Sequence, residues 1–105
     1  MISKDLLSFL TDLSVHNNKA WFKENKSRFD LLKQEFELLV HELIINLNEF
    51  DQSIEINTDP KKCIFRIYKD MRFSKEKLPY KTNFGAYIAK EGRKSGNAGY
   101  YLHIE

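Results

Sequence analysis

Charged and aromatic side chains are concentrated between residues 66 and 82, where the sequence reads RIYKDMRFSKEKLPYKT. This stretch carries six lysines or arginines and two acidic residues, Asp70 and Glu76. Like charges repel one another unless an anion lies between them, so a purely structural segment rarely needs this many cations. The pattern therefore predicts a site that binds an anion.

Arginine and lysine bind anions in different ways, and the segment supplies both. The planar guanidinium of arginine matches carboxylate or phosphate oxygens, whereas lysine adds a mobile point charge. Tyrosine can stack on a base or donate a hydrogen bond to a phosphate oxygen. The expected ligand carries phosphate and is either a small molecule or a nucleic acid. The predicted ligand-binding residues are Arg66, Tyr68, Lys69, Arg72, Lys77, Tyr80, Lys81 and Tyr101.

Asp70 and His103 are the candidate catalytic residues. Asp70 either orients the neighbouring arginines or acts as a general base, and His103 is a candidate because a histidine side chain can act as an acid or a base near neutral pH. If Asp70 or His103 acts as an acid–base group, the chain would be a hydrolase acting on phosphoester bonds. The sequence does not decide whether the protein is an enzyme. A third alternative is a structural scaffold in which an internal Arg–Asp network ties a loop to a sheet.

The sequence contains no recognisable metal or cofactor motif. Asp70, Glu76 and His103 lack the spacing of a metal site, and the chain has neither a phosphate-binding glycine loop nor a nucleophile elbow. We therefore expect neither a metal nor another cofactor.

Charge is distributed unevenly along the 105 residues, although the net charge is only +2. Residues 1–60 carry six Lys or Arg against eleven Asp or Glu, whereas residues 61–94 carry eleven against three. The acidic half could neutralise the basic half, or the basic half could face an anionic partner. The sequence leaves both alternatives open, and it does not indicate an oligomeric state.

Length and cysteine content indicate one domain in a reducing compartment. A chain of 105 residues supports a single modest core. The one cysteine, Cys63, has no internal partner for a disulfide, and the chain has no cationic leader and no apolar run long enough to cross a bilayer. We expect a cytoplasmic protein without membrane contact.

The first fifty residues have the periodicity of helices. A stripe of Leu6, Phe9, Leu10 and Leu13 follows the plausible N-cap Ser3. A second helical stretch runs from the capping residue Asn18 to Phe50, with a break expected between Asn25 and Ser27. Its apolar stripe is Phe29, Leu32, Phe36, Leu39, Val40, Leu43, Leu47 and Phe50.

The second half has the alternation of strands, first at Ile54 and Ile56, then over residues 63–73, 84–89 and 100–104. The expected fold is α+β, with N-terminal helices packed on one face of an antiparallel β-sheet. If the helices cover the sheet face that holds Phe65 and Ile67, side chains of the opposite parity lie together on the uncovered, open face. These residues are Arg66, Tyr68, Asp70, Arg72, Tyr87, Tyr101 and His103.

Residues 66–82 resemble a bacterial family, the domain of unknown function two-four-six-one, whose signature is RxxRDxRFxx[DN]KxxY followed by Lys-Thr. The chain departs from it at Lys69 and Glu76, which keep the charge but change the donor geometry and the reach. Residues 17–22 and 99–105 resemble two further family segments. The resemblance implies no established activity. It implies a longer family domain, of which residues 1–105 would form the N-terminal part.

Overall fold

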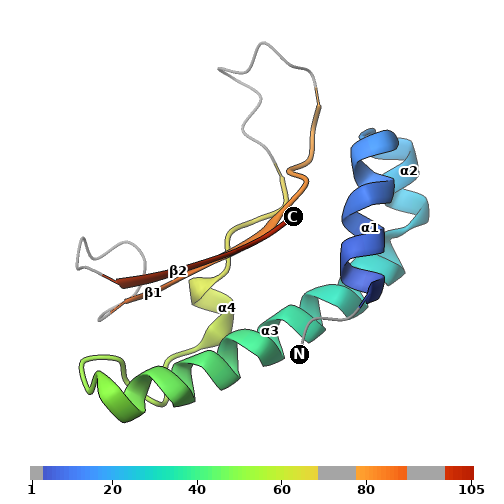
Figure 1. The fold of residues 1–105 in the computed structure, drawn as a ribbon. Helices are drawn as coiled ribbons and strands as arrows, with labels where there is room; N and C mark the ends of the chain where they lie inside the picture. The colour runs from blue at the N-terminus through green and yellow to red at the C-terminus, as the bar shows by residue number, and fades with distance from the viewer. Residues whose placement is uncertain (1–3, 69–77, 90–98) are drawn as a thin grey trace.

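A computed structural model describes residues 4–68, 78–89 and 99–105. Among these residues, four helices precede two strands, and Figure 1 shows their arrangement. They are α1 (Lys4–Val15), α2 (Lys19–Glu24), α3 (Lys26–Phe50), α4 (Pro60–Cys63), β1 (Phe84–Ala89) and β2 (Gly99–Ile104). The predicted α+β class is confirmed. Among the helices that the structure describes, none combines the length and apolar composition that a membrane span requires.

Helix α1 buries the four apolar residues that its sequence periodicity predicts. Leu6, Phe9, Leu10 and Leu13 are each at most 3% exposed, because the i, i+3, i+4, i+7 spacing places them on one side of the helix. The proposed N-cap Ser3 lies outside the described residues.

The predicted break in the long helix occurs at Asn25, between α2 and α3. The side chain of Asn18 accepts a hydrogen bond from the Trp21 amide at 2.8 Å and so caps α2. At the other end, the Asn25 side chain donates to the Trp21 carbonyl at 2.9 Å, and the Asn25 amide donates to the same carbonyl at 3.1 Å. Both asparagines therefore act where the sequence predicts.

Helix α3 carries the apolar layer over most of its 25 residues. Phe29, Leu32, Phe36 and Val40 are buried as predicted, and so is Ile44, which the predicted stripe omitted. Phe50 is the exception. It is 71% exposed at the last residue of α3, where its ring contacts the edge of the Tyr100 ring with centroids 6.3 Å apart.

Strands β1 and β2 form an antiparallel pair in which Phe84 lies opposite Ile104 and Ala89 opposite Gly99. Phe84, Ala86 and Ile88 point to the helices and are buried. Figure 1 shows the described helices gathered on one side of this pair, and the other face is left uncovered by them. The sequence analysis predicts this arrangement, in which helices pack on one face of an antiparallel sheet.

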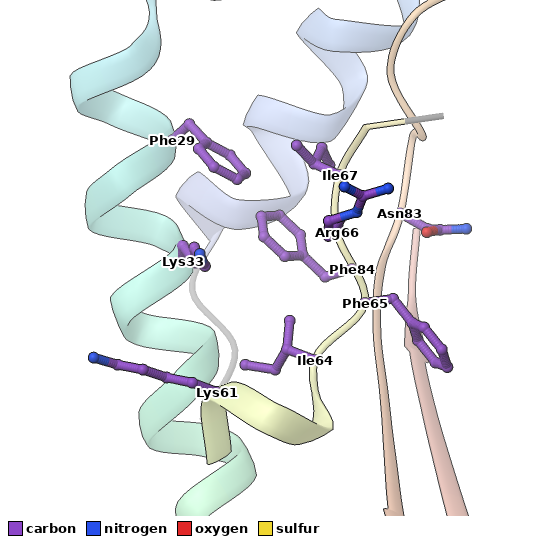
Figure 2. A pocket seen from close by; sticks show the side chains of 9 residues that line it. All are labelled: Phe29, Lys33, Lys61, Ile64, Phe65, Arg66, Ile67, Asn83 and Phe84. Carbon is purple, nitrogen blue, oxygen red and sulfur yellow. The ribbon is translucent and has the colours of Figure 1, made fainter. Parts of the chain in front are cut away.

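Residues 64–68 run beside β1 without forming a regular strand. The Phe65 amide donates to the Gly85 carbonyl at 2.9 Å, and Ile64 forms an isolated bridge with Ala86. The backbone then bends at Ile67. Ile64 and Ile67 are buried, whereas Phe65 points to the open face (Figure 2).

Two sequence-based expectations for strands are therefore wrong. Phe65 and Ile67 do not share a face, because the bend at Ile67 interrupts the period of two. Ile54 and Ile56 belong to a series of turns before α4 and not to a strand, although Ile54 itself is buried.

A polar contact joins the end of α3 to β2. The Asp51 carboxylate accepts hydrogen bonds from the Ser53 hydroxyl at 2.6 Å, from the Ser53 amide at 3.1 Å and from the Tyr100 hydroxyl at 2.9 Å. These bonds, those from Ser53 first, lower the pKa of Asp51 below its usual value of 3.8.

We predict that Tyr100→Phe lowers the free energy of unfolding near neutral pH but has little effect in acid. A carboxylate with a lowered folded-state pKa stabilises the protein above its unfolded-state pKa, and this contribution disappears as the pH falls through the folded-state value. Urea unfolding of both proteins from neutral pH to well below 3.8 measures the difference. The same comparison in an Asp51→Asn background should show no pH dependence over this range. A pH-independent cost of Tyr100→Phe in the native background would contradict the assignment.

Candidate functional site

Asn17, at the corner between α1 and α2, holds the backbone of Tyr80. Its side-chain nitrogen donates to the Tyr80 carbonyl at 2.8 Å, and its side-chain oxygen accepts from the Tyr80 amide at 3.0 Å. One amide side chain thus satisfies both backbone groups of Tyr80, as a neighbouring strand would. Tyr68 and Tyr80, which flank the segment, also form an antiparallel bridge.

The Tyr80 ring is fixed from two sides. Phe22 of α2 stacks on it with centroids 4.1 Å apart and planes 14° apart, and the Tyr68 ring lies 5.6 Å away. Tyr80 is only 6% exposed, and this burial, followed by the influence of Tyr68, raises the pKa of its hydroxyl. The predicted ligand residue Tyr80 therefore forms the floor of the site, whereas Tyr68 is 47% exposed.

A basic groove of about 330 Å³ lies over these two tyrosines. We call it the tyrosine groove, and its lining is Lys19, Phe22, Lys23, Lys26, Tyr68 and Tyr80. Three of the six lining residues are lysines and none is acidic. The sequence analysis did not identify these lysines. Lys19 and Lys23 have the four-residue spacing of one helix face on α2, and Lys26 begins α3 after the break at Asn25.

The groove lysines differ in their partners. Lys26 forms an ion pair with Asp30 at 3.0 Å, and this hydrogen bond raises the pKa of the lysine amine. Lys19 and Lys23 are exposed and form no ion pair within the part of the chain that the structure describes. Among the described residues, Lys26 is thus the groove lysine with an ion-pair partner.

A second cavity, of about 200 Å³, lies between α3, residues 64–67 and β1 (Figure 2). Its walls are apolar at Phe29, Ile64, Phe65, Ile67 and Phe84 and polar at Lys33, Lys61, Arg66 and Asn83. Figure 2 shows the Arg66 guanidinium on the side of Asn83, with the amine of Lys61 pointing away from it. We call this cavity the Arg66 pocket. Its three cations surround an apolar space without converging on one point.

The open face of the sheet holds a third group of predicted residues. Lys81 and Tyr101 line a hollow of about 240 Å³ with Phe65, Asn83 and Gly85. The Tyr101 hydroxyl lies 3.1 Å from Nδ1 of His103, and Nε2 of His103 lies 3.3 Å from the Glu105 carboxylate. His103 therefore has a polar neighbour on each ring nitrogen, and Glu105 is a partner that the sequence analysis did not identify.

The structure divides the predicted cluster between two faces. Arg66 and Tyr68 lie toward the helices, whereas Lys81, Tyr101 and His103 lie on the open face, so the prediction of a single face is wrong. The bend at Ile67 is the physical reason, since it turns successive side chains out of alternation. The predicted residues Lys69, Asp70, Arg72 and Lys77 lie outside the described residues. Within residues 4–68, 78–89 and 99–105, no three His, Cys, Asp or Glu side chains are grouped as metal ligands.

A family model described as a conserved hypothetical protein, DUF2461, matches residues 5–105. The chain belongs to this family. Searches of curated proteins and of solved structures gave no match. In this DUF2461 protein, two separate segments that resemble the family meet in space. Asn17 and Phe22 come from the first segment, and both contact Tyr80 at the end of the other.

We predict that Asn17→Ala lowers the free energy of unfolding by about 1–3 kcal/mol, because it leaves the amide and carbonyl of Tyr80 without their partner. Urea unfolding followed by circular dichroism measures the change. Asn46→Ala is the matched control, since Asn46 is exposed on α3, and its effect should be close to zero. Equal stabilities of the two variants would show that the Asn17 contacts contribute nothing.

Proposed function

We propose that this protein binds a phosphate-bearing ligand at the tyrosine groove. The proposal is carried by one observation, that three lysines surround an exposed tyrosine in a groove without a lining carboxylate. A group of cations attracts an anion, here chiefly through Lys19 and Lys23 because Lys26 is paired with Asp30, and lysine amines are common point-charge partners of phosphate. The Tyr68 hydroxyl adds a neutral donor beside them.

Two neighbouring features support the same ligand chemistry. Lys26 lies 5.8 Å from the centroid of the Phe29 ring, and Phe29 also lines the Arg66 pocket, so the two basic cavities are adjacent. The segment 69–77 follows Tyr68 directly in sequence and contains four lysines or arginines. Tyr68, the residue that precedes these cations in sequence, lines the groove.

We predict that Lys19→Gln combined with Lys23→Gln weakens binding of inorganic pyrophosphate or a nucleotide roughly tenfold, because each lost charge removes a charge-assisted hydrogen bond. Isothermal titration in low salt gives the affinity, and binding should weaken as salt is added. Lys4→Gln combined with Lys62→Gln is the control for net charge, since it also removes two charges and both lysines are exposed and line neither the groove nor the pocket.

Unchanged affinity in the double variant would place the ligand elsewhere. If the unaltered, folded protein binds neither probe in low salt, the proposal is wrong. The alternative of a structural scaffold would then gain support.

The contacts of His103 favour a second candidate function, hydrolysis of phosphoester bonds. A histidine held by a carboxylate on one nitrogen and a hydroxyl on the other resembles the arrangement that fixes the tautomer of an acid–base histidine. Lys81 lines the adjoining hollow and would face a phosphate there. The other acid–base candidate, Asp70, lies outside the described residues.

For this candidate we predict that His103→Gln lowers hydrolysis of a chromogenic phosphodiester by roughly a hundredfold or more, since general acid–base catalysis contributes about that factor. His41→Gln, a change of an exposed histidine on α3, should leave the rate unchanged. Initial rates at a series of pH values measure both. Absence of hydrolysis by the unaltered protein, or equal rates in the two variants, removes the enzymatic candidate and leaves the binding proposal intact.

A further inference from the structure

We infer that the phosphate-bearing ligand is a single-stranded nucleic acid, with a base stacked on Tyr68 and the backbone following a row of lysines. The inference rests on the proposed function and names the ligand class for the same groove. The row, which we call the lysine row, consists of Lys19, Lys23, Lys26 and Lys33.

The lysine row is longer than the phosphate group of one small molecule. Lys19 and Lys23 are four residues apart on α2, and Lys26 and Lys33 are seven residues apart on α3, so each pair lies on one side of its own helix. The seven residues from Lys26 to Lys33 extend about 10 Å along α3, and Lys19 and Lys23 continue the row on α2, so the row can contact more than one phosphate of an extended strand. Asp30 lies between Lys26 and Lys33 in sequence, and its carboxylate is paired with Lys26.

The row connects the two basic cavities. Lys19, Lys23 and Lys26 line the tyrosine groove, and Lys33 lines the Arg66 pocket. Phe29, below the Lys26 amine, forms part of that pocket. A strand that leaves the groove along α3 therefore meets further positive charge from Lys33 and Arg66.

Tyr68 has the properties of a stacking surface. Its ring is 47% exposed, yet it is supported from the protein side by Phe22 at 6.0 Å and Tyr80 at 5.6 Å. Its backbone is fixed by the bridge to Tyr80, which Asn17 holds in place. Stacking of one base on such an aromatic ring contributes about 1–3 kcal/mol and accepts any base.

An exposed tyrosine ring beside a row of lysines favours a single strand over a duplex as the ligand. Bases in a duplex are stacked on both sides, so a tyrosine face beside phosphate-binding lysines is useful only where a base is free. The chemistry is common to RNA and DNA, because it requires a base face and phosphates. A 2′-hydroxyl is not required.

The test titrates the full chain into labelled oligonucleotides and follows their fluorescence anisotropy. The probes are oligo(U), oligo(dT), an abasic strand of the same length and the duplex of oligo(dT) with oligo(dA). We expect both base-containing single strands to bind more tightly than the abasic strand by roughly 5- to 100-fold, the equivalent of one stacked base. Tyr68→Ala should remove this difference, and Tyr68→Phe should retain it. The ratio of the two single-strand affinities shows whether the sugar matters.

The lysine row is tested separately through salt dependence. Lys19→Gln with Lys33→Gln should reduce the slope of log affinity against log salt by about 0.7 for each lysine, whereas Lys62→Gln should leave the slope unchanged. Circular dichroism of each variant checks that it is folded. If Tyr68→Ala unfolds, the comparison of base-containing with abasic strands in the unaltered protein and in Tyr68→Phe still tests stacking.

Different failures separate this inference from the proposal on which it rests. Equal binding of abasic and base-containing strands, or tighter binding of the duplex, overturns the inference but leaves phosphate binding in place. If pyrophosphate and all the oligonucleotides fail to bind in low salt, both are wrong.

Discussion

The two hydrogen bonds between the Asn17 side chain and the Tyr80 backbone are the constraint on which the site depends. They satisfy a backbone donor and acceptor that have no strand beside them, and they fix Tyr80 against the corner of α1 and α2. Stacking of Phe22 on Tyr80 and bridging of Tyr68 to Tyr80 follow from that position. Together with the packing of Phe22, this contact places Tyr68 beside the lysines of α2.

The features that the sequence predicted well are those set by local interactions. The stripe of α1, the cap at Asn18 and the break at Asn25 depend on residues within four positions of one another. The path of residues 64–68 could not be predicted in the same way. Its bend at Ile67 accompanies pairing with β1 and with Lys81, which are distant in sequence, so Phe65 reaches the open face against the predicted alternation.

The candidate site was predictable in its chemistry but not in its assembly. Arg66 and Tyr68 do line basic cavities, and the helical spacing of the lysines was visible in the sequence. What the sequence could not show is that Lys19 and Lys23 would meet Tyr68. Burial of Tyr80 was likewise unforeseen, since an aromatic residue in a basic segment resembles a ligand contact until its packing against Phe22 is known.

The hydrogen bonds of Asn17 join residues 63 positions apart, and this separation has a consequence for folding. The helices can form early from neighbouring residues, whereas a contact over so long a loop must first overcome the entropy of closing it. We therefore expect the groove to assemble late in folding. A partly folded chain without this contact would lack the aromatic surface beside the lysines of α2.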